Sequence, residues 1–554
     1  MLGALWSLGA ASVARADTLS APELRSVAPA GMRLTAEQAI ERADRTRAAR
    51  TLRAEHSDTE AVPFVHEPIT RRRWTIAYTG AGDYTEVVID DRSGAVAAVW
   101  SGAQAEGEVG RPDVAGVLFR PYVWLPLCLL FLLPFVDPRR PFRLLHLDLL
   151  ALLGFGISNL FLFGGHDTLF YLSLYPLLGY LLVRMVVEGA RRRERSGRLM
   201  PLVPAGWLAV GLVLLVAFRI GLNLTDSHML DAGYAGVVGA DRIIAGEQLY
   251  VSGGSNFDTY GPVNYLAYVP FETIFPWGGL TVDNVSVGSD NDPAAGHAAA
   301  ISFDLLTMLG LFLIGWRLLG GASGRRLGLA LAFAWASFPY TLFALVMNTN
   351  DTLIAMLLVY ALLALTSPPG RGLLLGLASA VKFVPLLLAP LFARGAGPLK
   401  ARDPLVFGLT FAVTVAVSVA LYLPDGGLRE FYDATLGFQL SRKSLFSVWG
   451  AVPALDWLHT LVKIAVAVFA VAVAVVPRQR DLVQVAALGA AVIVGVELTA
   501  TYWTYFYIVW FLPFVLVALF ARYLPELSGA REPRSPSPLT SELALAASAP
   551  PAGH

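Results

Sequence analysis

The chain has 554 residues, and its 42 basic and 42 acidic side chains give a formal net charge of zero. Charged residues make up only 15% of the sequence, against roughly 25% in an ordinary soluble domain, and the mean hydropathy is +0.58. This excludes a soluble globular protein, a disordered chain and a coiled coil, and it gives no support for a nucleic-acid partner. The single cysteine, Cys128, excludes an internal disulfide framework and a cysteine zinc cluster. The sequence therefore predicts a polytopic membrane protein.

Residues 1–16 have the pattern of a signal peptide. A short apolar stretch, 2–13, precedes Ala14-Arg15-Ala16, which is the small-x-small arrangement of a cleavage site. An uncleaved membrane anchor is the alternative. Both interpretations predict that the segment that follows is exported.

Residues 17–111 are polar and contain no apolar run of membrane-spanning length. Thr35 and Gln38 form the pattern of a capping box, so we expect a helix from here to about Arg50. In three later segments, apolar and polar residues alternate, or strand-forming residues lie between turn signals. Both patterns are typical of half-buried strands. These strands are expected at 73–78, 84–90 and 95–100.

The order of a helix followed by hairpins resembles a PepSY-like domain. The resemblance depends on Trp74, which opens a strand, and on VIDDRSGAVAAVWSG at 88–102, which closes the sheet. It implies a small exported α+β module, and its sequence shows no nucleophile, metal cluster or phosphate loop.

Residues 112–527 are predicted to form a mainly helical membrane domain, because apolar runs alternate with short charged loops. One further apolar run, 372–393, is interrupted by Lys382 and Pro385. The tail, 528–554, is rich in Ser, Pro and Ala and is predicted to be disordered and cytoplasmic. About eleven spans are expected, at 121–136, 144–163, 168–188, 203–222, 299–319, 327–346, 351–366, 404–422, 455–476, 481–500 and 507–522.

Basic residues accumulate in cytoplasmic loops, which orients the predicted spans in the plasma membrane. The basic loops share one side only if 372–393 enters the membrane and returns as a re-entrant hairpin. The kink at Pro385 and the buried Lys382 favour this return, because broken helices are tolerated where they line a protein cavity. The polar, aromatic-rich segments then meet on the outer face, and they are loops 223–298 and 423–454 with turns 347–351 and 501–506.

The order of motifs from about residue 200 to 522 resembles GT-C membrane glycosyltransferases, specifically glycosyltransferase family 87. That family includes polyprenyl-phosphate-mannose-dependent mannosyltransferases. The sequence departs from the family by a long insertion, 278–297, which has no assigned role. The motifs are Asp231-x-x-Tyr234, ADRIIAGEQLY (240–250), TYGPVNYLAYVPFETIFP (259–276), NTND (348–351), GLLLGLASAVKFVPLLLAPLF (372–392), FQLSRKSLFSVWG (438–450) and TYWTYFYIVWFLPF (501–514).

The resemblance implies a donor sugar, mannose or another hexose or pentose, linked to polyprenyl phosphate. The acceptor is expected to be a lipid or glycan of the cell envelope. An aspartate of the first outer loop acts as the base in such enzymes, which gives inversion at the anomeric carbon. Carried over, this base is Asp231, with Asp226 as the alternative, and His228 is a candidate for orienting the acceptor.

Three basic residues are candidates for binding the phosphate of the donor. Arg442 and Lys443 lie in the second outer loop, where the alternative is a pair of solvated loop charges. Lys382 lies in an apolar helix, where a lysine costs about 2.5–3.5 kcal/mol on insertion scales, so it needs a partner. Its structural alternative is an ion pair with Asp304, Asp351 or Glu497.

The remaining candidates for acceptor or sugar binding are Tyr234, Tyr260, Asn350 and Trp449, although interfacial aromatic belts also explain such aromatic residues. No dinucleotide fingerprint, Walker loop or metal-ligand spacing is visible, so no cofactor or metal is expected, and the resemblance does not exclude a divalent cation. A transporter or flippase of lipid-linked sugar is the alternative function. Transporters usually contain internal repeats with paired broken helices, whereas this sequence has one interrupted segment.

Overall fold

The structure is a computed structural model that describes part of the chain. The predicted signal peptide, the predicted tail, His228, Arg442 and Lys443 lie outside the described residues, as do most of the 278–297 insertion and the side chain of Asp231. The described residues are 18–20, 22, 24–56, 59–67, 72–80, 83–101, 121–163, 166–191, 197–227, 229–250, 259–276, 293–398, 400–441 and 447–523.

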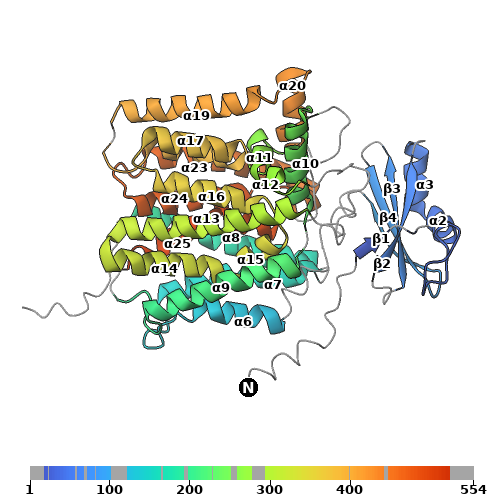
Figure 1. The fold of residues 1–554 in the computed structure, drawn as a ribbon, viewed down its shortest axis with the longest axis horizontal. Helices are drawn as coiled ribbons and strands as arrows, with labels where there is room; N and C mark the ends of the chain where they lie inside the picture. Colours follow the sequence, from blue (N-terminus) through green and yellow to red (C-terminus); the bar gives the residue numbers. More distant parts are fainter. Residues whose placement is uncertain are drawn as a thin grey trace, which may run out of the picture.

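An antiparallel five-stranded sheet and two helices form the N-terminal unit (Figure 1). The capping box of Thr35 and Gln38 is confirmed, and so are the three expected strands. The expected single helix to Arg50 is wrong, because the chain breaks at Arg45 and Thr46 caps a second helix. The strands follow chain order in the sheet and are β1 (Thr18–Ser20), β2 (Glu60–Glu67), β3 (Arg73–Gly80), β4 (Asp83–Asp90) and β5 (Val96–Ser101), with helices α2 (Ala36–Asp44) and α3 (Arg47–Glu55).

The N-terminal unit has its own core. Trp74, Ile76 and Tyr78 of β3 alternate in the period of a strand and are fully buried against α2. The Tyr78 hydroxyl donates to Asp44 Oδ1 at 2.7 Å. The unit is therefore a small α+β module, and its PepSY-like identity stays a prediction.

The rest of the described chain is helical, and six of its helices are long and apolar enough to cross a membrane. These helices are α7 (Leu144–Phe163), α8 (Asp167–Ala190), α9 (Ala205–Thr225), α13 (Ala294–Leu319), α19 (Arg402–Ala420) and α23 (Asp456–Val475). A seventh span forms if the pair α14 (Gly321–Ser337) and α15 (Pro339–Val346), bent by 59°, is counted as one. This composition supports the predicted polytopic membrane protein.

The other four predicted spans correspond to shorter helices, so the count of about eleven stays a prediction. They are α6 (Pro121–Leu132), α16 (Asp351–Leu363), α24 (Leu482–Glu497) and α25 (Ile508–Phe520), the last preceded by η5 (Tyr505–Tyr507). The remaining elements are α10 (Asp231–Ala245), α11 (Pro262–Leu266), α12 (Val269–Ile274), α17 (Pro368–Ser379), η2 (Val384–Leu388), α18 (Ala389–Arg394), α20 (Gly427–Tyr432), η3 (Asp433–Gly437), α21 (Phe438–Ser441), α22 (Val448–Ala451) and η4 (Pro453–Leu455).

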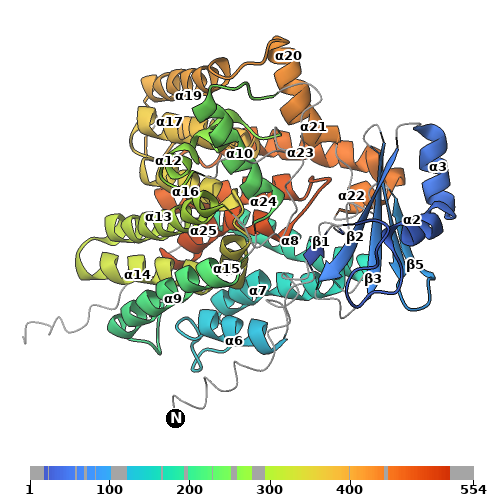
Figure 2. The same ribbon diagram turned by 45° about the vertical axis from the view of Figure 1, so that its right-hand side comes forward.

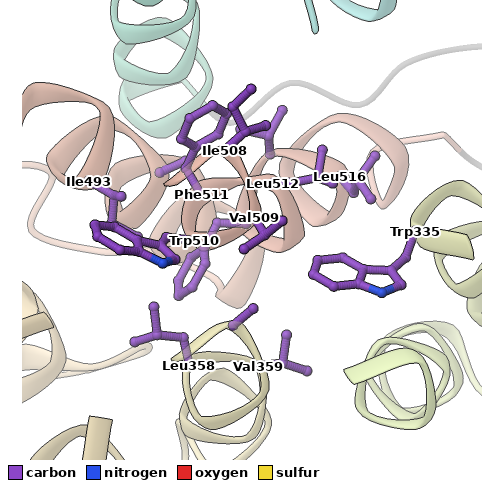
Figure 3. Packing of buried hydrophobic residues seen from close by; sticks show 14 of the residues in the cluster. Trp335, Leu358, Val359, Ile493, Ile508, Val509, Trp510, Phe511, Leu512 and Leu516 are labelled. Carbon is purple, nitrogen blue, oxygen red and sulfur yellow. The ribbon is translucent and has the colours of Figure 1, made fainter. Parts of the chain in front are cut away.

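Helix α25 lies in the middle of the helical core. All of its residues are buried, and Figure 3 shows Trp510 between Ile493 of α24 and Leu358 of α16. Trp335 of α14 lies on the other side of the same cluster (Figure 3). The Trp510 indole N–H also donates to Asp351 Oδ1 at 3.0 Å, which holds the start of α25 against the start of α16.

The interrupted segment 372–393 turns back on itself. Arg371, just before it, donates to the carbonyl of Ala393 at its far end, with a distance of 3.1 Å. Beyond it, the amide of Gly397 donates to the carbonyl of Arg480 at 2.9 Å, so two basic loops meet. The segment therefore ends beside the point at which it begins, and its re-entry into the membrane stays a prediction.

Candidate functional site

Polar segments that are far apart in the sequence converge at one end of the helical domain. Figure 1 shows α10, α11 and α20 together at this end, and Figure 2 shows α10 and α20 at the same end after rotation. Tyr250, which follows α10, packs edge-on against Phe431 of α20, with ring centroids 5.0 Å apart. The described parts of the two predicted outer loops therefore contact each other.

The turn 347–351, which carries the NTND motif, is tied to the first outer loop by a network of amides. Asn348 has φ 48°, a left-handed conformation that asparagine tolerates better than most residues. Its Oδ1 accepts from Asn223 Nδ2 at 2.8 Å, and its Nδ2 donates to Ser227 Oγ at 3.2 Å. Asn223 is fully buried, so this network holds the end of α9 against the turn.

Helix α10 packs closely against the turn at Gly233 and against Tyr268 at Gly236, two glycines spaced three residues apart. An added Cβ would lie 2.4 Å from the Asn348 carbonyl oxygen at Gly233 and 2.5 Å from the Tyr268 ring at Gly236. The amide of Leu230, just before α10, donates to the carbonyl of Met347 at 3.2 Å. These contacts place the backbone of Asp231, the first residue of α10, beside the turn.

The proposed base itself is not tested by these contacts. The side chain of Asp231 is outside the described residues, so its role stays a prediction. The alternative base, Asp226, is exposed and follows the last turn of α9. Both aspartates flank a backbone segment that contacts the turn.

The TYGPVN segment is hydrogen-bonded to the break that follows α17. The amides of Gly261 and Val263 donate to the carbonyls of Val381 at 3.0 Å and Ala380 at 3.1 Å. At Gly261 an added Cβ would lie 2.1 Å from the Ala380 carbonyl oxygen, a backbone atom that cannot move aside alone. Glycine therefore allows this close approach, which brings Tyr260 next to Lys382.

Replacing Gly261 by alanine is expected to push these two segments apart. Overpacking of this kind costs about 1–3 kcal/mol of stability, so the thermal unfolding temperature of the purified protein should fall. Gly206→Ala is the matched control, because an added Cβ at Gly206 on α9 meets nothing within 4 Å. Equal unfolding temperatures for the two variants would contradict the close approach.

Lys382 and Asp351 form the charged centre of this region. The Lys382 ammonium lies 2.6 Å from Asp351 Oδ1, and the Trp510 indole N–H donates to the same oxygen at 3.0 Å. Of the three partners that the sequence left open for Lys382, the structure selects Asp351. The other two bind elsewhere, because Asp304 pairs with Arg219 at 2.7 Å and Glu497 accepts from Trp503 at 3.2 Å.

Three aromatic rings surround the Lys382 ammonium. Its nitrogen lies 5.2 Å from the ring centroid of Tyr260, 5.8 Å from that of Tyr507 and 5.3 Å from that of Trp510, all within the range of cation–π attraction. The Lys382 side chain is 14% exposed, whereas that of Asp351 is 3% exposed. The rings and Asp351 thus hold the Lys382 ammonium in place, and its accessible side can bind an anionic group.

The candidates for acceptor or sugar binding separate into two groups. Tyr260 lies at Lys382, and Asn350 directly precedes Asp351 in the turn and donates through Nδ2 to Asn264 Oδ1 at 2.8 Å. Tyr234 is instead 1% exposed within the main hydrophobic core. Trp449 stacks on His459, with centroids 4.8 Å apart, and donates to the carbonyl of Leu498 at 2.7 Å.

Asn264, Tyr268 and Trp510 also belong to this region and were not predicted from the sequence. All three lie within the motifs 259–276 and 501–514. The available signal for Asn264 was an asparagine within the otherwise apolar stretch 262–271, because an amide that becomes buried there needs a partner. Among the described residues, no group of three or more His, Cys, Asp or Glu side chains is arranged to hold a metal ion.

Part of the chain is similar to a known protein family. Residues 259–501 match the model of glycosyltransferase family 87. The match covers TYGPVN, the turn 347–351 and Lys382, and it begins after the segment that carries Asp226 and Asp231. No curated protein matches the chain. The match supports a GT-C-like membrane domain, and the protein is a glycosyltransferase.

Proposed function

We propose that this glycosyltransferase transfers a sugar from a polyprenyl-phosphate donor to a lipid or glycan acceptor on the outer face of the plasma membrane. The observation that carries the proposal is the Lys382–Asp351 pair. It lies within aromatic rings, in the region matched to the family, at the end where the predicted outer segments meet. A lipid phosphate supplies the anion that such a cation can bind.

The proposed reaction is an inverting displacement at the anomeric carbon. The acceptor oxygen forms a bond to this carbon while the bond to the phosphate oxygen breaks, and the phosphate leaves with the electron pair. Asp231, or alternatively Asp226, takes the proton of the acceptor hydroxyl. Lys382, Arg442 and Lys443 neutralise the negative charge that develops on the leaving phosphate.

Transfer by the purified protein tests the proposal. The protein in lipid nanodiscs is given farnesyl-phosphate-linked mannose, glucose or arabinose together with extracted envelope lipids, and the products are analysed by mass spectrometry. We expect one sugar to be added to an acceptor, with release of farnesyl phosphate. Transfer from nucleotide sugars, with none from any of the lipid-linked donors, would contradict the proposed donor.

The proposed orientation is tested by labelling from outside the cell. Cys128 is first replaced by alanine, and single cysteines are placed at Ser255 and at Ser441 in the two predicted outer loops. Both should react with an impermeant thiol reagent added to intact cells, since the returning segment 372–393 keeps the two loops on one side. Labelling of only one position would contradict the re-entrant arrangement.

The match favours an enzyme over the transporter that the sequence left open. We also propose that the N-terminal α+β unit is extracytoplasmic and without chemistry of its own. The same labelling method tests its side with a cysteine at Ser93, which is exposed in the turn after β4.

A further inference from the structure

Four neutral side chains of the segments 264–268 and 349–350, which lie on one side of the Lys382–Asp351 pair, carry polar atoms with no hydrogen-bond partner among the described residues. Asn264, Tyr268 and Asn350 are 0% exposed, and Thr349 is 1% exposed. Burial of such atoms without a partner costs free energy, so native proteins nearly always satisfy them. These atoms are Asn264 Nδ2, Tyr268 Oη, Thr349 Oγ1 and Asn350 Oδ1.

The four residues belong to two segments that meet at the Asn264–Asn350 hydrogen bond. Asn350 donates to Asn264 at 2.8 Å, and Thr349 is its neighbour in the turn. Tyr268 lies one helical turn after Asn264, and its amide continues the turn by donating to the carbonyl of Tyr265 at 3.0 Å. Asp351, which follows Asn350, interacts electrostatically with the Tyr268 hydroxyl. The group thus lies between α11–α12 and the start of α16.

The chemistry of the group matches hydroxyl groups. It offers an amide donor, an amide acceptor and two hydroxyls that can each donate and accept, and it carries no charge. A phosphate would instead need cations, and Lys382 lies at the edge of the group through its pair with Asp351. The four neutral side chains fit the hydroxyl groups of a sugar. The neighbouring Lys382 and Tyr260 fit a phosphate joined to that sugar.

We infer that Asn264, Tyr268, Thr349 and Asn350 bind the hydroxyl groups of the transferred sugar, and that Tyr268 and Thr349 help to determine which sugar is accepted. The inference rests on the proposed polyprenyl-phosphate donor. Ordered water is the competing occupant, because it also satisfies buried polar groups.

Two conservative variants separate sugar binding from packing. Tyr268→Phe and Thr349→Val each remove an unpartnered hydroxyl and keep most of the side-chain shape. If packing were the only role, removal of these hydroxyls should leave the unfolding temperature unchanged or raise it. If they bind sugar, each variant should lower kcat/KM by about tenfold, which corresponds to the loss of one hydrogen bond in the transition state.

Ligand-induced stabilisation provides a second measurement that does not need turnover. The unfolding temperature is measured with farnesyl phosphate and with farnesyl-phosphate-linked mannose, glucose and arabinose. In the parental protein the best sugar-bearing ligand should stabilise more than farnesyl phosphate. Both variants should lose this additional stabilisation while keeping the shift caused by farnesyl phosphate.

A matched control and three outcomes decide the matter. Tyr360→Phe is the control. It removes a hydroxyl of α16 that lies nine residues after Asp351, about 13 Å away along the helix axis, and this variant should behave as the parental protein. Parental behaviour of both Tyr268→Phe and Thr349→Val would mean that the atoms bind only water, and the inference would be wrong. It would also be wrong if farnesyl phosphate stabilised the parental protein and no sugar added to the effect. If neither type of ligand bound, the proposed donor would be wrong and the inference would fall with it.

Discussion

Asp231→Asn is expected to lower the rate of sugar transfer by about 10²–10⁴-fold, the usual contribution of a general base. The substitution keeps the size of the side chain and removes its basicity, so expression and donor binding should remain nearly parental. Asp231 is the first residue of α10, and contacts of α10 with the turn 347–351 hold its backbone beside that turn. Initial rates and the stabilisation by farnesyl phosphate measure the two effects separately.

Asp226→Asn is the comparison variant for this prediction. Asp226 is exposed beyond the end of α9, and its substitution should have the smaller effect if Asp231 is the base. The reverse order of effects would assign the base to Asp226. Parental rates for both variants would mean that neither aspartate accepts the proton, and another group of the site would have to do so.

The sequence could not predict which apolar helices face lipid and which are shorter helices of the protein interior. In α9, α19 and α23 only 17%, 11% and 22% of the apolar window is buried inside the protein, and these helices have spanning length. By contrast, every residue of α25 is buried, and α25 has 13 residues. Hydropathy is high in both kinds of helix because lipid and protein interior are both apolar, so the sequence could not distinguish a lipid-facing span from a shorter interior helix.

Local patterns predicted local structure in the N-terminal unit. The capping box at Thr35 and the alternation in β3 and β4 gave the correct elements, because both depend on neighbouring residues. Strand β2 was missed, since Pro63 lies within it and proline argues against a strand. Its pairing with β3 over Glu60–Val65 is a tertiary contact, which overrides that local signal.

The candidate site depends still more on tertiary contacts. The sequence required a partner for Lys382 but could not choose among Asp304, Asp351 and Glu497, because the partner is decided by how α16 and the break after α17 pack. The pair of Asn264 and Asn350 joins residues 86 positions apart. Neither residue has a local pattern that indicates the other, so the neutral group beside Lys382 became visible only in the fold.

Lys382→Met is expected to destabilise the protein strongly. Removing one partner of a buried ion pair leaves the other charge uncompensated, which costs about 3–5 kcal/mol. Among the described residues, the Trp510 indole N–H would then be the one remaining donor to Asp351 Oδ1. The unfolding temperature of the purified variant should therefore fall well below that of the parental protein, and its transfer activity should be lost with it.

The double variant Lys382→Met/Asp351→Asn distinguishes a structural cation from one that binds the donor. It removes both charges and keeps an oxygen that can accept from Trp510, so most of the lost stability should return. Stabilisation by farnesyl phosphate and transfer activity should nevertheless stay low, since the cation for the lipid phosphate is gone. Asp304→Asn is the matched control for the loss of stability. It leaves Arg219 without its partner in another buried ion pair and does not change Lys382. If the double variant transferred sugar at the parental rate, Lys382 would serve only to neutralise Asp351, and Arg442 and Lys443 would be the remaining candidates for the phosphate.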